Sequence, residues 1–219
     1  MAEIIPAIIG QNFTEVANKI RLIEAAAQWV HLDIMDGTFT AAASWPAAAA
    51  DQAPADLESL DGQIKIECHL MVRAPEKILP AWVKTVDRVL IHLETTDRLA
   101  EIAATLANLP VELGIALSLE TPLSKIDPFL QRVCVVHLMS IAKIGEHGQP
   151  FATPVLEKIK HLRAARPDVT IQVDGGINLQ TAPLAAAAGA DNLVVGSAIW
   201  QTPDPISALQ AFQSLLPKS

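Results

Sequence analysis

The sequence is poor in cysteine and has no long apolar run, and each shortage excludes a class of protein. Its two cysteines, Cys68 and Cys134, lie in apolar strand-like runs, so we expect buried thiols in a reducing compartment rather than a disulfide framework. No stretch approaches the roughly 18 uninterrupted apolar residues of a membrane span, and the opening MAEIIPAIIG lacks a secretory signal pattern. These absences predict a cytoplasmic protein that does not enter a membrane.

Basic residues are also scarce. The chain has 16 Lys and Arg against 24 Asp and Glu, a net charge of −8, and its basic residues form no cluster. Such a chain repels phosphate backbones and anionic lipid, so we expect neither nucleic acid nor a membrane surface as a partner. A small phosphorylated ligand stays compatible with this charge, because a few backbone amides can hold a phosphate locally.

Turning to what is present, 219 residues that are 51% hydrophobic suit one domain spanning residues 1–219. Short β-branched runs alternate with amphipathic segments, which predicts right-handed βαβ units and a parallel sheet. Eight strands at this spacing favour an α/β fold of the (β/α)8 TIM barrel type. A doubly wound open sheet is the alternative, but the glycine-rich turn after its first strand is missing. The predicted strands are 3–9, 29–35, 64–72, 88–94, 112–119, 134–140, 169–174 and 192–196.

The segments between the strands have the periodicity of helices in most places. Two of them break the rhythm: residues 37–62 are rich in Ala and Pro with a weak helical signal, and residues 141–152 form a polar loop. Both follow strands, which in a barrel places them at the catalytic C-terminal end. The predicted helical segments are 13–27, 75–86, 96–109, 122–133, 153–165, 179–190 and 205–216.

Polar side chains recur on one face of several predicted strands. A strand alternates its faces with period two, so His31 and Asp33 point the same way, and Asp174 ends the seventh strand. One such residue usually means a hydrogen-bonded core position. Four at strand ends need a shared counter-charge, and two imidazoles with two carboxylates indicate a divalent transition-metal site. The candidate set is His31, Asp33, His69 and Asp174, with Met35, Met71, His137 and Met139 on the same faces. His92 and Glu94 also share a face, and we expect an ordinary structural pair there, with support of the site as the alternative.

Two glycine turns follow the last two predicted strands, in VDGGIN (173–178) and VVGSAIW (194–200). Barrels frequently hold a phosphate in these loops, where backbone N–H groups point at the anion. The alternative is that the glycines only make tight turns. We favour a phosphate cradle that includes Gly175, Gly176, Gly196 and Ser197, over which Gly145, Gly148 and Gln149 of the preceding loop can close.

At these residues the sequence resembles the ribulose-phosphate 3-epimerase family, in HLDIMDG, ECHLMV, a GxxGQPF loop, VDGGIN and VVGSAIW. The resemblance implies a metal-dependent isomerase that interconverts D-ribulose 5-phosphate and D-xylulose 5-phosphate, commonly as a homo-oligomer. By position, His31, Asp33, His69 and Asp174 would hold a divalent cation, most often zinc, with iron, manganese or cobalt as alternatives. Asp33 and Asp174 would be the acid and base, and the three methionines would surround the reacting carbon.

The sequence departs from the family pattern near the substrate. The serine usual after the first-strand proline is Ala7, residues 37–42 read GTFTAA, and the loop after the sixth strand reads AKIGEHGQ. These changes leave the metal set intact but alter the walls of the site. They keep two alternatives open: a 3-epimerase of another ketose phosphate, such as a ketohexose 6-phosphate, and a non-catalytic phosphosugar-binding barrel.

Overall fold

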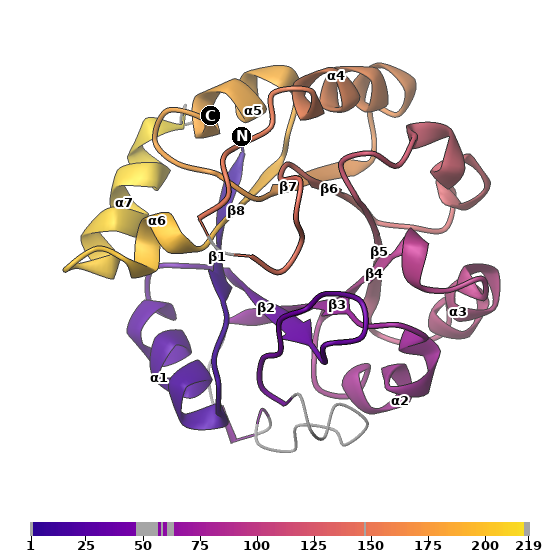
Figure 1. Ribbon diagram of the computed structural model, residues 1–219, viewed down its shortest axis with the longest axis horizontal. Helices are drawn as coiled ribbons and strands as arrows, with labels where there is room; N and C mark the ends of the chain where they lie inside the picture. The colour runs from indigo at the N-terminus through magenta and orange to yellow at the C-terminus, as the bar shows by residue number, and fades with distance from the viewer. Residues whose placement is uncertain (1, 47–56, 58, 61–63, 147, 217–219) are drawn as a thin grey trace.

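The structure, a computed structural model, describes residues 2–46, 57, 59, 60, 64–146 and 148–216. In these residues, eight parallel strands pair in chain order, and β1 pairs with both β2 and β8 to close the barrel. Figure 1 shows the helices forming a ring outside the strands, so the predicted (β/α)8 TIM barrel is confirmed. The strands are β1 (Glu3–Ile8), β2 (Trp29–Met35), β3 (Lys65–Met71), β4 (Arg88–His92), β5 (Glu112–Leu117), β6 (Val135–Met139), β7 (Thr170–Asp174) and β8 (Asn192–Val195).

The helices are shorter than the periodic segments predict. Residues 75–86 divide into a 3₁₀ helix, Pro75–Lys77, and a single α-turn. Pro80 explains the break, because it lacks the N–H that a continuous helix would bond to the carbonyl of Glu76. Residues 122–133 likewise form only a 3₁₀ helix, Leu123–Phe129, which contains Pro128. The α-helices are α1 (Phe13–Ile23), α2 (Leu79–Trp82), α3 (Leu99–Leu106), α4 (Val155–Ala165), α5 (Ala182–Ala188), α6 (Ser197–Trp200) and α7 (Pro205–Leu215). None of these helices in the described residues is long and apolar enough to cross a membrane.

One prediction about the cysteines is wrong. Cys68, on β3, is fully buried, but Cys134 is exposed. The apolar run that suggested burial continues into β6, whereas Cys134 precedes the first residue of that strand, Val135. At the edge of the barrel a side chain before the strand is not covered by the adjacent helices.

Because successive residues of a strand point to opposite faces, the strands contribute to two separate interiors, one between the strands and the helices and one inside the barrel. Outward-facing residues pack with the helices in one apolar core that includes Leu32, Leu70, Val136 and Leu193. The inward-facing residues include apolar ones such as Leu90 and Val194, but many are buried and polar: His31, Asp33, Glu67, His69, Arg88, His92, His137, Gln172 and Asn192. Buried polar and charged groups are costly unless each finds a partner. The barrel interior therefore depends on a connected polar network.

The segments after β2 and β6 meet over the C-terminal end of the barrel. A Cβ added at Gly145 would lie 2.8 Å from the Cβ of Thr40, so the two loops touch. Figure 1 shows the loop after β6 running across the barrel opening. Much of the segment 37–62, including 47–56, lies outside the described residues, as does residue 147.

Candidate active site

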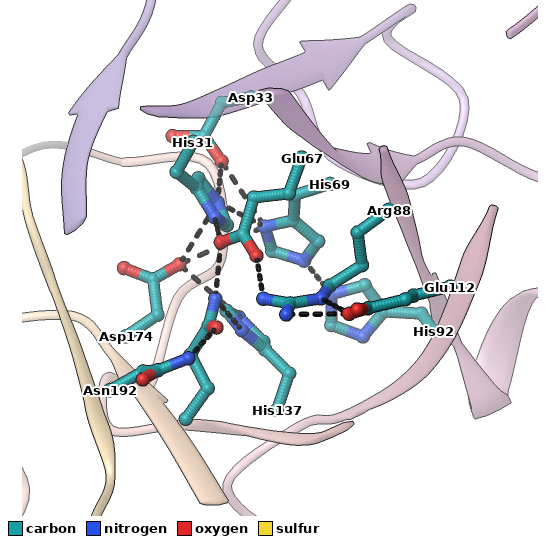
Figure 2. Close-up of polar contacts among 11 residues, drawn as sticks. His31, Asp33, Glu67, His69, Arg88, His92, Glu112, His137, Asp174 and Asn192 are labelled. Atoms are coloured by element: carbon teal, nitrogen blue, oxygen red, sulfur yellow. Dashed lines mark hydrogen bonds and ion pairs between the residues drawn. The ribbon is translucent and has the colours of Figure 1, made fainter. Parts of the chain in front are cut away.

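The four side chains predicted to bind a metal meet at the C-terminal end of the barrel. His31 and Asp33 come from β2, His69 from β3 and Asp174 from the end of β7. Asp33 Oδ1 lies 3.1 Å from both His31 Nε2 and His69 Nδ1. Asp174 Oδ2 lies 3.9 Å from His31 Nε2 and 3.7 Å from His69 Nδ1 (Figure 2). We call these four residues the metal cluster.

The spacing within the metal cluster fits one divalent cation. One nitrogen or oxygen atom from each residue lies within 4.8 Å of the other three. A transition metal with ligands at about 2.0–2.2 Å keeps neighbouring ligand atoms about 3–4 Å apart. The contacts of 3.1, 3.7 and 3.9 Å lie in that range. Two imidazoles and two carboxylates are also a donor set that suits such a cation.

Glu67 orients the first of the two histidines. His31 Nδ1 lies 2.7 Å from Glu67 Oε1, so Nδ1–H donates to this carboxylate and Nε2 faces the cluster. The other oxygen of Glu67 pairs with Arg88 at 2.7 Å, and Arg88 contacts Glu112 at 2.6 Å. Burial alone would raise the pKa of Glu67, but His31 and Arg88 lower it to about 2. A charged acceptor behind a ligating imidazole fixes both its tautomer and its orientation.

Replacing Glu67 with glutamine should weaken binding of a divalent cation about 10- to 100-fold. The amide is a weaker acceptor for His31 Nδ1–H, and Arg88 loses one of its two carboxylates. A competition titration against a chelator measures this affinity. Glu112→Gln is the matched control, because Glu112 pairs with the same arginine without touching His31. Equal losses in the two variants would contradict a specific role for Glu67.

The second histidine is oriented by a longer chain of contacts. His69 Nε2 lies 2.8 Å from His92 Nε2, and His92 Nδ1 lies 3.1 Å from Glu94 Oε2. Glu94 also accepts from the backbone N–H of Ser118 at 2.9 Å and from the hydroxyl of Thr121. Since a carboxylate only accepts, His92 carries its proton on Nδ1, and its Nε2 accepts from His69 Nε2–H. His69 Nδ1 is then left with a lone pair facing the cluster, so the expected His92–Glu94 pair also orients His69.

The two aspartates of the metal cluster have pKa values that are shifted in opposite directions. Burial alone would raise the pKa of Asp33, but His31 and His69 outweigh it and lower this pKa well below its ordinary value. Burial raises the pKa of Asp174 to about 6, and the charge of Asp33 adds to this effect. One carboxylate is therefore ionised while its neighbour titrates near neutral pH. Carboxyl pairs separated in this way act as an acid and a base.

A cavity of about 280 Å³ borders the cluster and is lined by Asp33 and Asp174. Ten further residues predicted to contact substrate also line it: Ala7, Met71, Met139, Gly145, Gly148, Gln149, Gly175, Gly176, Gly196 and Ser197. Met35, the last residue of β2, is buried but does not line the cavity, and its backbone N–H donates to the hydroxyl of Ser44. The predicted phosphate-binding residues and the two aspartates of the metal cluster therefore line one cavity.

Lys19 is a cavity residue that the sequence did not reveal. Its Nζ donates to the carbonyl of Ile9 at 2.7 Å and lies 5.5 Å from the ring centre of Trp200. Of the described residues that line the cavity, Lys19 alone is a lysine or arginine. In the sequence it lies among polar residues of α1, where the helical pattern indicates only a solvent-facing side chain.

Gly176 is a position where the turn after β7 requires glycine. Its φ of +66° is left-handed, and an added Cβ would lie 2.4 Å from the backbone N of Phe151. Gly176→Ala should therefore lower the free energy of unfolding by about 2–4 kcal/mol, measured by urea denaturation. Gly148→Ala is the control, because its φ of +70° carries the same strain but nothing lies within 4 Å. Equal destabilisation of the two variants would contradict the close approach at Gly176.

Comparison with known proteins identifies the family of the chain. The model of the ribulose-phosphate 3 epimerase family matches residues 3–200. The ribulose-phosphate 3-epimerases of Bacillus subtilis and Mycobacterium leprae are each 30% identical to this chain, over 95% and 96% of it and 97% and 93% of their own lengths.

Solved structures show the shared fold at lower identity. A 3-hexulose-6-phosphate synthase superposes with a TM-score of 0.70 at 16% identity, covering 97% of this chain and 99% of its own. An orotidine 5'-monophosphate decarboxylase from Sulfolobus solfataricus gives a TM-score of 0.64 at 15% identity, covering 98% and 97%. With the family match along residues 3–200, the chain belongs to the ribulose-phosphate 3-epimerase family, whose members are isomerases that act on carbohydrates.

Proposed function

We propose that this protein is a metal-dependent epimerase that interconverts D-ribulose 5-phosphate and D-xylulose 5-phosphate. The observation that carries the proposal is the pair of aspartates in the metal cluster. Asp33 and Asp174 come from strands on different sides of the barrel, line one cavity, and have pKa values shifted in opposite directions. Inversion at a carbon beside a ketone needs two such groups, one for each face of the flattened carbon.

Proton transfer is assigned to these two carboxyl groups. The ionised aspartate removes the proton from C3, and the electron pair of the broken C–H bond passes into the ketone to form an enediolate. The protonated aspartate then delivers its proton to the opposite face of C3, which restores the ketone with inverted configuration. After one turnover the first aspartate is protonated and the second is ionised. In the reverse reaction the second aspartate is therefore the base and the first is the acid.

The metal cluster would hold the divalent cation, with His31 Nε2 and His69 Nδ1 as its nitrogen ligands. We favour zinc, with iron, manganese and cobalt as alternatives. When bound, such a cation supplies Lewis-acid stabilisation to the negative oxygens of an enediolate. Glu67, which is buried, and Glu94, which is half-buried and acts through His92, keep both ligand rings in the required tautomer.

The phosphate of the substrate would bind against the part of the cavity wall that Gly176, Gly196 and Ser197 form. This wall lies in the loops after β7 and β8, where barrels commonly hold phosphate. Lys19 supplies a local positive charge in a protein of net charge −8. The local cation offsets the unfavourable field of the whole chain for an anionic substrate.

Incubation of the metal-loaded protein with ribulose 5-phosphate in deuterium oxide tests the proposal. We expect nuclear magnetic resonance to show xylulose 5-phosphate together with deuterium at C3. The absence of both product and label would reject this substrate. Detectable turnover would in turn exclude a barrel that only binds phosphosugars.

The alanine at position 7 is the reason to test a longer ketose phosphate as well. Ala7 lines the cavity, and a Cβ added at Gly196 would lie 3.6 Å from the Cβ of Ala7. A methyl group here offers substrate no hydrogen bond, which a serine hydroxyl would supply. We expect kcat/KM for ribulose 5-phosphate to exceed that for ketohexose 6-phosphates at least about tenfold; the opposite order would assign the protein to the larger sugar.

A further inference from the structure

His137 is a third buried imidazole beside the metal cluster, and neither the cluster nor the proposed mechanism uses it. It lies on β6, and its ring centre is 5.5 Å from that of His31 and 4.5 Å from that of His69. Among buried side-chain nitrogen and oxygen atoms of the described residues, its Nε2 is the one without a hydrogen-bond partner. A buried polar atom left unpaired is costly, so it calls for a functional explanation.

The contacts on the other side of the ring determine where its proton lies. Gln172, opposite His137 in the β6–β7 register, places its Nε2 at 2.6 Å from Glu67 Oε1 and 3.2 Å from His137 Nδ1. Since the Glu67 carboxylate only accepts, the group that Gln172 turns towards it is the NH₂. Asn192 Nδ2, 3.3 Å from Gln172 Oε1, supports the same amide orientation. Gln172 therefore donates to His137, and Nδ1 accepts.

An imidazole whose Nδ1 accepts carries its proton on Nε2. A second proton on Nδ1 would point at the NH₂ group of Gln172, so this contact also disfavours the doubly protonated ring. Nε2 is then a donor, and it has no lone pair to offer a cation. Asp174 Oδ2 lies 3.4 Å from this Nε2, close enough to accept its proton but not aligned for a hydrogen bond in this structure.

We propose that His137 is a positioning residue, which donates from Nε2–H to Asp174 Oδ2 and so fixes the carboxylate that exchanges protons with substrate. The proposal rests on the proposed epimerase function. In Figure 2, Oδ2 of Asp174 faces the imidazoles, and its other oxygen points away from them. Hydrogen bonds of this kind often start long and tighten when substrate binds. The polar chain from Asn192 through Gln172 and His137 thus ends on the proton-transfer group.

Two substitutions at His137 separate this role from simple packing. His137→Leu fills similar space without a donor, and we expect kcat to fall about 10- to 100-fold with KM changed less than about threefold. His137→Gln can accept from Gln172 through its carbonyl and donate to Asp174 through its amide, so it should restore most of kcat. A leucine variant with wild-type kcat, or a glutamine variant no better than leucine, would overturn the proposal.

Two readouts do not depend on turnover. In ¹⁵N-histidine-labelled wild-type protein, the His137 signals should show a protonated Nε2 and an unprotonated Nδ1; the reverse tautomer would overturn the proposal even if the leucine variant failed to fold. Metal content per chain should stay at the wild-type level in both variants, since His137 is not a ligand, and loss of metal from both would overturn it. Failure of the wild-type protein to epimerise ribulose 5-phosphate would refute the proposed function, and the tautomer measurement would still decide whether His137 donates to Asp174.

Discussion

Replacing Asp174 with asparagine is expected to lower kcat for epimerisation by about 10³-fold or more, and Asp33→Asn should do the same. Each amide keeps the shape of the side chain but can neither take nor give the proton at C3. The raised pKa of Asp174, about 6, and the lowered pKa of Asp33 suit them to opposite halves of the exchange. Steady-state kinetics with a coupled assay measures the loss. Asp168→Asn is the control, since Asp168 pairs with Arg166 on the exposed surface.

Isotope exchange makes this prediction sharper. An enzyme left with one carboxyl group can still remove a proton and return a deuteron to the same face. In deuterium oxide we therefore expect each variant to label C3 of only one of the two epimers, and the two variants to label opposite ones. Both epimers labelled by a single variant would show that one residue serves both faces, contrary to the assignment of Asp33 and Asp174. Metal content measured on the same samples distinguishes lost proton transfer from lost cation.

Removal of the divalent cation is expected to abolish activity and to lower the melting temperature. Without a cation, the metal cluster brings two carboxyl groups together in a buried site, which is unfavourable unless a proton or a positive charge offsets them. A cation that binds only the folded chain stabilises it by mass action, about 2.7 kcal/mol at 100 times its Kd. Chelation followed by re-addition of single metals, with differential scanning calorimetry and the epimerase assay, measures both effects.

The control for metal removal is a variant that lacks a ligand. His69→Gln should show a low melting temperature that neither chelator nor metal changes. Full activity of the wild-type protein with less than about one tenth of a metal ion per chain would contradict metal dependence. A melting temperature that responds to metal equally in wild type and His69→Gln would place the cation elsewhere.

The metal cluster could be predicted because two simple rules suffice for it. Period two places His31 and Asp33 on one face of β2, and barrel closure brings the ends of β2, β3 and β7 to the same rim. The bounds of β2, Trp29–Met35, agree with the sequence pattern at both ends. The same topology places the glycines that follow β7 and β8 at this rim.

The residues that orient the cluster carried a weaker signal. Glu67 lies on the inward face with His69, so alternation does identify its direction, but a carboxylate near the start of a strand is typical of an exposed barrel end. Its partners Arg88 and Gln172 are 21 and 105 residues away in the chain. Which polar groups meet inside a barrel depends on the tilt and register of every strand, and one strand's pattern does not contain this information.

Other differences have local causes. The apolar periodicity predicted longer helices around Pro80 and Pro128 than the structure has. Periodicity reflects only the spacing of apolar side chains, so it does not show that proline lacks the N–H a helix needs. Met35 shares a face with His31 and Asp33 but does not line the cavity, and Ser44 of the loop after β2 bonds to its backbone N–H. A shared strand face therefore predicts which way a side chain points, and it does not predict whether that side chain reaches the cavity.

Anomalous X-ray scattering from a crystal of the metal-loaded protein tests the central claim most directly. We predict one metal peak, located between His31 Nε2, Asp33, His69 Nδ1 and Asp174, and its loss in His69→Gln. A peak at any other place, or none in a preparation that epimerises ribulose 5-phosphate, would contradict the account.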